Sequence, residues 1–148
     1  MNISNFKNPF FIGVAGVGMS AIAQYLQGIG MQVSGSDRYF HEGEYNKTKE
    51  QLENEGIKCF LQDGSGITAE TDLVVVSTAI EDTVYEVKKA KELGIPIIKR
   101  SQLLAMIAKS KKTIAVAGTS GKSTTSAMLF QILLDAGLEP SIISLAGL

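Results

Sequence analysis

The chain has 148 residues, of which 45% are hydrophobic and 20% are charged, as in an ordinary globular domain. Its 14 basic and 15 acidic residues give a formal net charge of −1, so the charge balance indicates no nucleic-acid partner. No apolar run approaches the ~20 residues that span a bilayer, and no membrane partner is expected. The single cysteine, Cys59, excludes a disulfide within the chain and favours a reducing, cytoplasmic location.

Short apolar runs alternate with amphipathic segments along the chain. Runs such as "LVVV" and "IAVA" are typical of parallel strands that are buried on both faces. We expect strands at residues 10–14, 32–35, 57–60, 72–77, 96–99, 113–117 and 141–145. Helical spacing of apolar residues predicts helices at 18–29, 45–55, 82–93, 101–108 and 122–136. The alternation predicts an α/β fold, a Rossmann-like parallel sheet with flanking helices.

The first strand runs into a glycine turn, G-x-A-G-x-G, at Gly13 to Gly18. It is close to the dinucleotide fingerprint G-x-G-x-x-G, although Ala15 takes the place of the second glycine. In that fingerprint, glycines let the backbone approach a pyrophosphate. A helix starting near Gly18 would present free N–H groups and a positive dipole end to a diphosphate. The alternative is a tight strand-to-helix turn without a ligand.

Polar residues follow two of the predicted strands. Asp37, in "VSGSD", lies about 20 residues after the glycine turn, where an acidic side chain can accept hydrogen bonds from a ribose or base edge. An ordinary helix cap is the alternative for Asp37. Ser77 and Thr78 follow "LVVV" at the sheet edge where open parallel sheets bind ligands. They either hydrogen-bond that ligand or cap the next helix.

A second glycine loop, "GTSGKST", follows the run "IAVA" and precedes a helix. It matches the phosphate-loop pattern G-x-x-x-x-G-K-[ST] except at Val116, which stands where the first glycine belongs. Backbone N–H groups of such a loop cradle phosphates, Lys122 reaches the terminal phosphates, and the Ser123 hydroxyl can ligate Mg²⁺. The polar stretch "AKSKK" before it indicates a boundary between domains at residues 1–108 and 109–148, or simply a solvated helix end.

Taken in order, these stretches resemble the Mur ligases, the family that assembles the peptide of peptidoglycan. The resemblance covers nearly the whole chain and rests on "GVAGVGMSAIAQYL", "VSGSD", "DLVVVSTAI", "ELGIPIIKRSQLLA" and "AVAGTSGKSTTSAML". It is closest to the branch that joins L-alanine to UDP-N-acetylmuramate. It implies a first domain for the UDP-linked substrate and, from residue 109, the opening strand–loop–helix–strand of an ATP-binding domain.

The resemblance also implies the roles of individual residues. Residues expected to contact the UDP-substrate are Ala15, Gly16, Val17, Gly18, Met19, Ser20, Ser36, Asp37, Ser77 and Thr78. Residues expected to bind ATP are Gly118, Thr119, Ser120, Gly121, Lys122, Ser123 and Thr124, with Lys122 catalytic and Ser123 on Mg²⁺. In the family, ATP phosphorylates the substrate carboxylate, and the amino group of an amino acid then attacks the acyl phosphate.

Several positions depart from the alanine-adding pattern. Ser120 stands where that branch usually has His, and Ser123 where it has Thr. A Gly-His element usually follows the third strand, where this chain reads "LQDG", and Asn-Pro-Glu usually follows "SAI", where it reads "EDTVYE". These departures leave the added amino acid open, with a muramate–tripeptide recycling ligase as the main alternative. The chain alone is expected to bind UDP-substrate without catalysis, because the family's further metal ligands and amino-acid domain lie beyond it.

Two other classes compete with the ligase. A stand-alone UDP-sugar-binding module would use the first glycine loop without chemistry. A fragment of an NAD-dependent oxidoreductase would explain the first loop and Asp37 but would leave "GTSGKST" without a role. Oligomeric state does not follow from the sequence.

Overall fold

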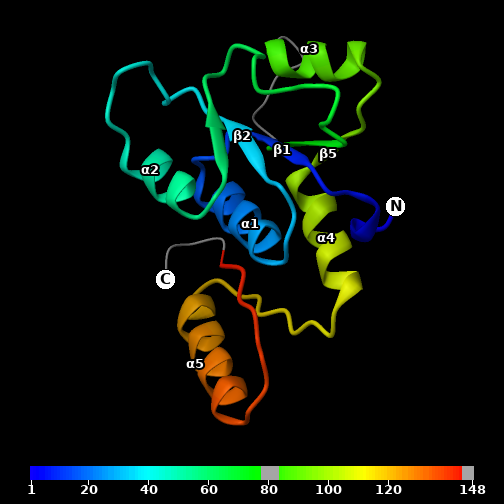
Figure 1. Ribbon diagram of the computed structural model, residues 1–148. Helices are drawn as coiled ribbons and strands as arrows, with labels where there is room; N and C mark the ends of the chain where they lie inside the picture. The colour runs from blue at the N-terminus through cyan, green and yellow to red at the C-terminus, as the bar shows by residue number, and fades with distance from the viewer. Residues whose placement is uncertain (78–83, 145–148) are drawn as a thin grey trace.

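A computed structural model describes residues 1–77 and 84–144 (Figure 1). Five parallel strands form one sheet in the order β3-β2-β1-β4-β5. The strands are β1 (Pro9–Ile12), β2 (Ser34–Ser36), β3 (Lys58–Phe60), β4 (Leu73–Val76) and β5 (Ile97–Lys99). The chain starts at the centre of the sheet and winds outward to each edge in turn, the doubly wound arrangement of dinucleotide-binding folds. The predicted α/β parallel sheet is therefore confirmed.

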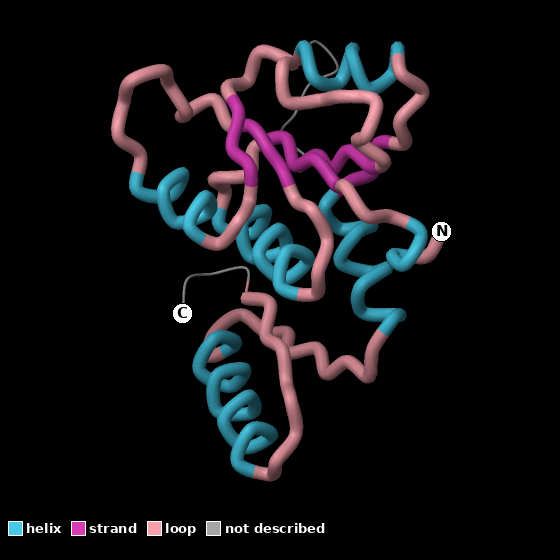
Figure 2. Tube along the Cα trace, viewed as in Figure 1, coloured by secondary structure: helices cyan, strands magenta, loops and turns pink. Residues whose placement is uncertain are grey.

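Helices cover both faces of the sheet (Figures 1 and 2). One face carries α3 (Tyr85–Glu92), and the other carries α1 (Val17–Gly28), α2 (Lys47–Asn54) and α4 (Arg100–Ser110). Successive side chains of a strand point to opposite faces. In β1, Phe11 accordingly packs in the larger core with α1 and α4, whereas Phe10 and Ile12 pack in the smaller core beneath α3. A short 3-10 helix (Ile3–Asn5) precedes β1.

The last helix, α5 (Lys122–Asp135), lies apart from the sheet (Figure 1). It contains no buried residue, and its apolar side chains Met128 and Ile132 are each 61% exposed. After α5 the chain returns toward the sheet, where Ile143 packs against the larger core. The first four helices are thus held by tertiary packing, while α5 is held chiefly by its own backbone hydrogen bonds.

Two predicted strands are not formed. Residues 113–117 have no strand pairing, and neither do residues 141–144; residue 145 lies outside the described residues. A strand needs a neighbour to satisfy its N–H and C=O groups, and neither run pairs with a strand of the sheet. The phosphate loop and its helix are present, but the expected strand–loop–helix–strand unit is reduced to loop and helix.

The predicted boundary between residues 108 and 109 falls within the last turn of α4, which continues to Ser110. That boundary stays a prediction. In the described part of the chain, no helix combines the length and apolar character needed to cross a membrane.

Candidate nucleotide site at the carboxyl edge of the sheet

The first glycine loop is bonded to the end of β2. Gly13 adopts a left-handed conformation, with φ of 83°, that turns the chain sharply as β1 ends. The N–H groups of Gly13 and Val14 then both donate to the Ser36 carbonyl, at 2.8 and 3.0 Å. These bonds explain why β1 ends at Ile12 rather than at Val14: the backbone has left the ladder to close the turn.

Asp37 fixes the next residue of the loop. Its carboxylate is nearly buried, with the residue 4% exposed, and Oδ2 accepts a hydrogen bond from the Ala15 N–H at 2.9 Å. Oδ1 accepts one from the Tyr39 N–H at 3.0 Å. Both oxygens therefore organise backbone, although an ionised carboxylate keeps further lone pairs for a ligand. A contact between Asp37 and the uridine stays a prediction.

The amino end of α1 is the part of the loop that can receive an anion. Gly16 is the N-cap residue, and its carbonyl accepts from the N–H groups of Met19 and Ser20. The N–H groups of Val17 and Gly18 have no hydrogen-bond partner among the described residues. Free N–H groups and the positive end of the helix dipole form an anion site of the kind that binds phosphates.

Four further residues are predicted to contact the UDP-substrate: Met19, Ser20, Ser77 and Thr78. The Met19 side chain is buried in the larger core, and the Ser20 hydroxyl donates to the Val17 carbonyl at 3.0 Å. The Met19 side chain is therefore not available to a ligand, whereas the Ser20 oxygen keeps lone pairs that can accept a hydrogen bond. Ser77 lies half-buried just after β4. Thr78 lies outside the described residues.

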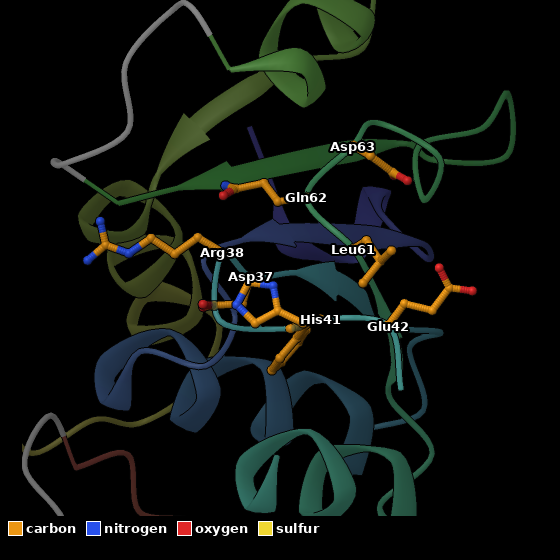
Figure 3. A pocket seen from close by; sticks show the side chains of 8 residues that line it. Asp37, Arg38, His41, Glu42, Leu61, Gln62 and Asp63 are labelled. Atoms are coloured by element: carbon orange, nitrogen blue, oxygen red, sulfur yellow. The ribbon is translucent and has the colours of Figure 1, made fainter. Parts of the chain in front are cut away.

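A cavity of about 380 Å³ opens beside the loop, at the carboxyl ends of β2 and β3 (Figure 3). It is lined by Asp37, Arg38, Phe40, His41, Glu42, Leu61, Gln62 and Asp63. Phe40 and Leu61 supply apolar surface against which a planar base can pack, and the six other lining side chains are polar or charged. Apart from Asp37, none of these residues is predicted from the sequence to contact a ligand, although Leu61, Gln62 and Asp63 belong to the divergent stretch "LQDG". The available signal is that both lining segments follow strands whose carboxyl ends meet at one edge of the sheet.

The Ser36 hydroxyl is bonded within the protein, and a contact between Ser36 and the UDP-substrate stays a prediction. Ser36 is fully buried, and its hydroxyl donates to Oε1 of Glu86 at 2.9 Å. Glu86 lies in the first turn of α3 and is also fully buried. Glu86 ends the stretch "EDTVYE", but the sequence does not predict its contact with Ser36, because the two residues lie 50 positions apart.

The second glycine loop is formed and exposed. Gly121 is the N-cap residue of α5 in a left-handed conformation, with φ of 77°. The Lys122 ammonium turns back to the Gly118 carbonyl, with Nζ and O 2.6 Å apart. The N–H groups of residues 119–124 have no partner in the described structure, so the loop offers a row of donors beside a cation. These features fit a phosphate chain.

The two loops do not form one site. They share no hydrogen bond among the described residues, and α5 stands away from the sheet (Figure 1). Residues 1–77 and 84–144 also contain no group of three His, Cys, Asp or Glu side chains arranged to hold a metal ion. The assignment of Ser123 to Mg²⁺ stays a prediction.

The parallel sheet and the braced glycine loop are typical of nucleotide-binding proteins, and comparison with known proteins identifies the family. Residues 10–112 match the family model described as "Mur ligase family, catalytic domain". The chain belongs to the Mur ligase family.

Individual relatives carry more specific names. The chain is 39% identical over 137 residues to the UDP-N-acetylmuramate–L-alanine ligase of Dichelobacter nodosus, covering 93% of this chain and 28% of that protein. It is 45% identical over 133 residues to the enzyme of the same name from Carboxydothermus hydrogenoformans, covering 89% and 28%. The chain thus spans little more than a quarter of the length of these relatives.

Two solved structures have the same fold. A murein peptide ligase from Psychrobacter arcticus matches with a TM-score of 0.75 and 30% identity, over 88% of this chain and 27% of that one. A UDP-N-acetylmuramate–alanine ligase from Thermotoga maritima matches with a TM-score of 0.74 and 29% identity, over 89% and 30%. The parallel sheet is therefore that of a Mur ligase, and the two structures come from both branches that the sequence left open.

Proposed function

We propose that this chain binds the uridine diphosphate end of UDP-N-acetylmuramate for a cytoplasmic ligase of peptidoglycan synthesis. The ligase joins an amino acid, L-alanine, to the muramyl carboxylate through an acyl phosphate made with ATP. Residues 1–108 hold the UDP-linked substrate, and residues 109–148 contribute the phosphate loop for ATP.

The amino end of α1 carries the proposal. The loop before it is bonded to the end of β2 by the Gly13, Val14 and Ala15 N–H groups. That bracing leaves the Val17 and Gly18 N–H groups as free donors at the positive end of a 12-residue helix. A diphosphate binds there without reorganising the loop.

The cavity beyond the loop suits the rest of the nucleotide. Asp37 belongs to both features, since it accepts from the Ala15 N–H and lines the cavity. A uridine attached to a diphosphate at α1 reaches the segments after β2 and β3. Phe40 and Leu61 supply the apolar walls, and the remaining lone pairs of Asp37 can accept from the ribose or base.

ATP fits the second loop in part. The free N–H groups of residues 119–124 can cradle the phosphates, and Lys122 stands ready to pair with them once it leaves the Gly118 carbonyl. Bound ATP would supply the phosphoryl group that activates the carboxylate, and Mg²⁺, held in part by Ser123, would neutralise charge on the phosphates. Because α5 has no buried residue, we expect weak ATP binding and no amide formation by this polypeptide alone.

A second candidate concerns the acceptor. The Psychrobacter arcticus structure is named a murein peptide ligase, and Ser120 departs from the alanine-adding pattern. A ligase that attaches a ready-made peptide to UDP-N-acetylmuramate would use the same first loop. The choice between the two changes the amino component and leaves the UDP site as described.

Substitution at Val17 tests the UDP site directly. Val17 is the first residue of α1, where proline is well tolerated because it lacks only an N–H that has no helical partner. Gly16 before it, with φ of −64° and ψ of 137°, has the extended conformation that a following proline requires. Val17→Pro therefore removes one anion donor and keeps the helix.

Calorimetric titration with UDP-N-acetylmuramate measures the effect. We expect Val17→Pro to bind about three- to tenfold more weakly than the unaltered chain, the loss of one hydrogen bond. Val17→Ala is the matched control, because it removes the exposed side chain but keeps the N–H. Tight binding of NAD with no response to UDP-N-acetylmuramate would refute the proposed function.

A further inference from the structure

Glu86 is a buried carboxylate with an incomplete set of hydrogen bonds. The residue is 0% exposed, and Oε1 accepts from the Ser36 hydroxyl at 2.9 Å. Oε2 has no hydrogen-bond partner among the described residues. A buried polar atom without a partner destabilises a fold, and such atoms are rare in native proteins. The unpartnered oxygen of Glu86 therefore indicates that this carboxylate has a role other than packing.

Ser36 connects Glu86 to the glycine loop. The Ser36 hydroxyl points to the α3 face of the sheet, toward Glu86. Its carbonyl accepts from the N–H groups of Gly13 and Val14, which form the first turn of the loop. A single residue at the end of β2 therefore carries both contacts, and a shift of its backbone moves the donors of the loop with it.

We infer that Glu86 is a positioning residue for the nucleotide site. Through Ser36 it holds the glycine loop where the Val17 and Gly18 N–H groups meet a diphosphate. This inference rests on the proposed function, because the position of the loop matters for affinity only if a diphosphate binds there. Glu86 itself touches no ligand.

The same helix provides an internal control. Lys89 lies one turn along α3, and its ammonium donates to the Gly64 carbonyl at 2.8 Å. That bond anchors α3 to the segment between β3 and β4 and makes no contact with the glycine loop. Lys89→Met thus loosens α3 without breaking the link through Ser36.

The substitutions separate the hydrogen bond from the charge and from the bulk. Glu86→Leu keeps the size but removes the acceptor, Ser36→Ala removes the donor, and Glu86→Gln keeps a carbonyl acceptor for Ser36 without the charge. We expect Glu86→Leu and Ser36→Ala each to weaken binding of UDP-N-acetylmuramate about three- to tenfold. The double variant should bind no more weakly than the single variant with the lower affinity, because the two substitutions remove the same contact.

The amide resonances of Gly13 and Val14 report the position of the loop without any ligand. In the ¹⁵N-labelled chain of 148 residues, these two resonances should move in Glu86→Leu and in Ser36→Ala. They should stay near their original positions in Glu86→Gln and in Lys89→Met. Unmoved resonances in Glu86→Leu and Ser36→Ala would overturn the inference. An equal movement of these resonances in Lys89→Met would also overturn it. So would a movement in Glu86→Gln as large as that in Glu86→Leu.

The experiments test ligand binding and loop position separately. If the unaltered chain does not bind UDP-N-acetylmuramate, the proposed function falls, while the ligand-free amide resonances still decide whether Glu86 positions the loop. If Glu86→Leu does not fold, Ser36→Ala and Glu86→Gln give the same comparison.

Discussion

Asp37 and Ala15, 22 residues apart in the chain, are joined by a hydrogen bond of 2.9 Å between a carboxylate oxygen and a backbone N–H. The bond crosses from the end of β2 to the loop after β1. The acidic residue that the nucleotide fingerprint places after the second strand thus braces the first glycine loop in the absence of a ligand. Its two oxygens hold two backbone segments, Ala15 on one side and Tyr39 on the other.

Neutralising Asp37 should weaken both the fold and the binding site. In Asp37→Asn an amide NH₂ replaces one of two oxygens that each face a backbone N–H, so one donor loses its acceptor. We expect the free energy of unfolding to fall by about 1–3 kcal/mol, together with weaker binding of UDP-N-acetylmuramate. Urea denaturation and calorimetry measure the two effects. Asp135→Asn, on exposed α5, is the control and should change stability by less than about 0.5 kcal/mol.

Gly35 gives the loop room to pack on the sheet. A Cβ added there would lie 2.7 Å from both the Phe11 carbonyl oxygen and the Val14 Cβ. Gly35→Ala should therefore lower the free energy of unfolding by about 1–3 kcal/mol, as overpacking does. At Gly28, in α1, an added Cβ meets nothing within 4 Å, and Gly28→Ala should gain about 0.5–1 kcal/mol. Equal effects at the two sites would contradict the close packing of loop and strand.

The isolation of α5 predicts a contrast between two leucines in helices. Leu26 in α1 is 0% exposed and Leu134 in α5 is 48% exposed. Leu26→Ala should lower the free energy of unfolding by about 2–5 kcal/mol, whereas Leu134→Ala should change it by less than about 0.5 kcal/mol. Denaturation followed by circular dichroism measures both. A large loss at Leu134 would mean that α5 packs against the rest of the chain.

Cys59 should be an inert thiol. Burial raises its pKa from 9.0 to about 12, with the Glu53 carboxylate adding to the shift. Alkylation by iodoacetamide at pH 8 should be about 1,000-fold slower in the folded chain than in urea, because the thiolate is the reactive form and its fraction falls about tenfold for each unit that the pKa rises. Comparable rates in the two states would contradict the burial of this side chain.

The same pKa shift has a consequence for stability. Because the folded thiol keeps its proton to higher pH than the unfolded one, its contribution is complete below pH 9.0 and is lost as the pH rises toward 12. Any stability advantage of the unaltered chain over Cys59→Ala should therefore shrink between pH 9 and 11, and the variant can become the more stable of the two. A difference that stays constant with pH would contradict the raised pKa.

Local sequence patterns predicted most of the sheet but not the contacts that brace the site. The apolar runs at Phe10 to Ile12 and Leu73 to Val75 are buried on both faces, as continuous runs in parallel strands should be. The similar run at residues 113–117 forms no strand, because strand formation needs a neighbour that local sequence does not supply.

The candidate site shows the same division. The glycine pattern predicted a turn at the amino end of a helix, and the structure places Gly13 and Gly16 there. No local pattern predicts that both carboxylate oxygens of Asp37 accept hydrogen bonds from backbone N–H groups. Nor does one predict that the Ser36 hydroxyl donates to Glu86 on the α3 face of the sheet. These are contacts between distant segments, and they exist only once the strand order is set.

The most direct test of the proposed UDP site is an NMR titration of the ¹⁵N-labelled chain with UDP-N-acetylmuramate. If the diphosphate binds at the amino end of α1, the Val17 and Gly18 amide protons should shift downfield in proportion to ligand bound, since each gains a charged acceptor. UDP should reproduce these shifts, and Val17→Pro should weaken the binding. Saturating ligand that leaves Val17 and Gly18 unmoved, or that moves only residues 118–124, would contradict the account.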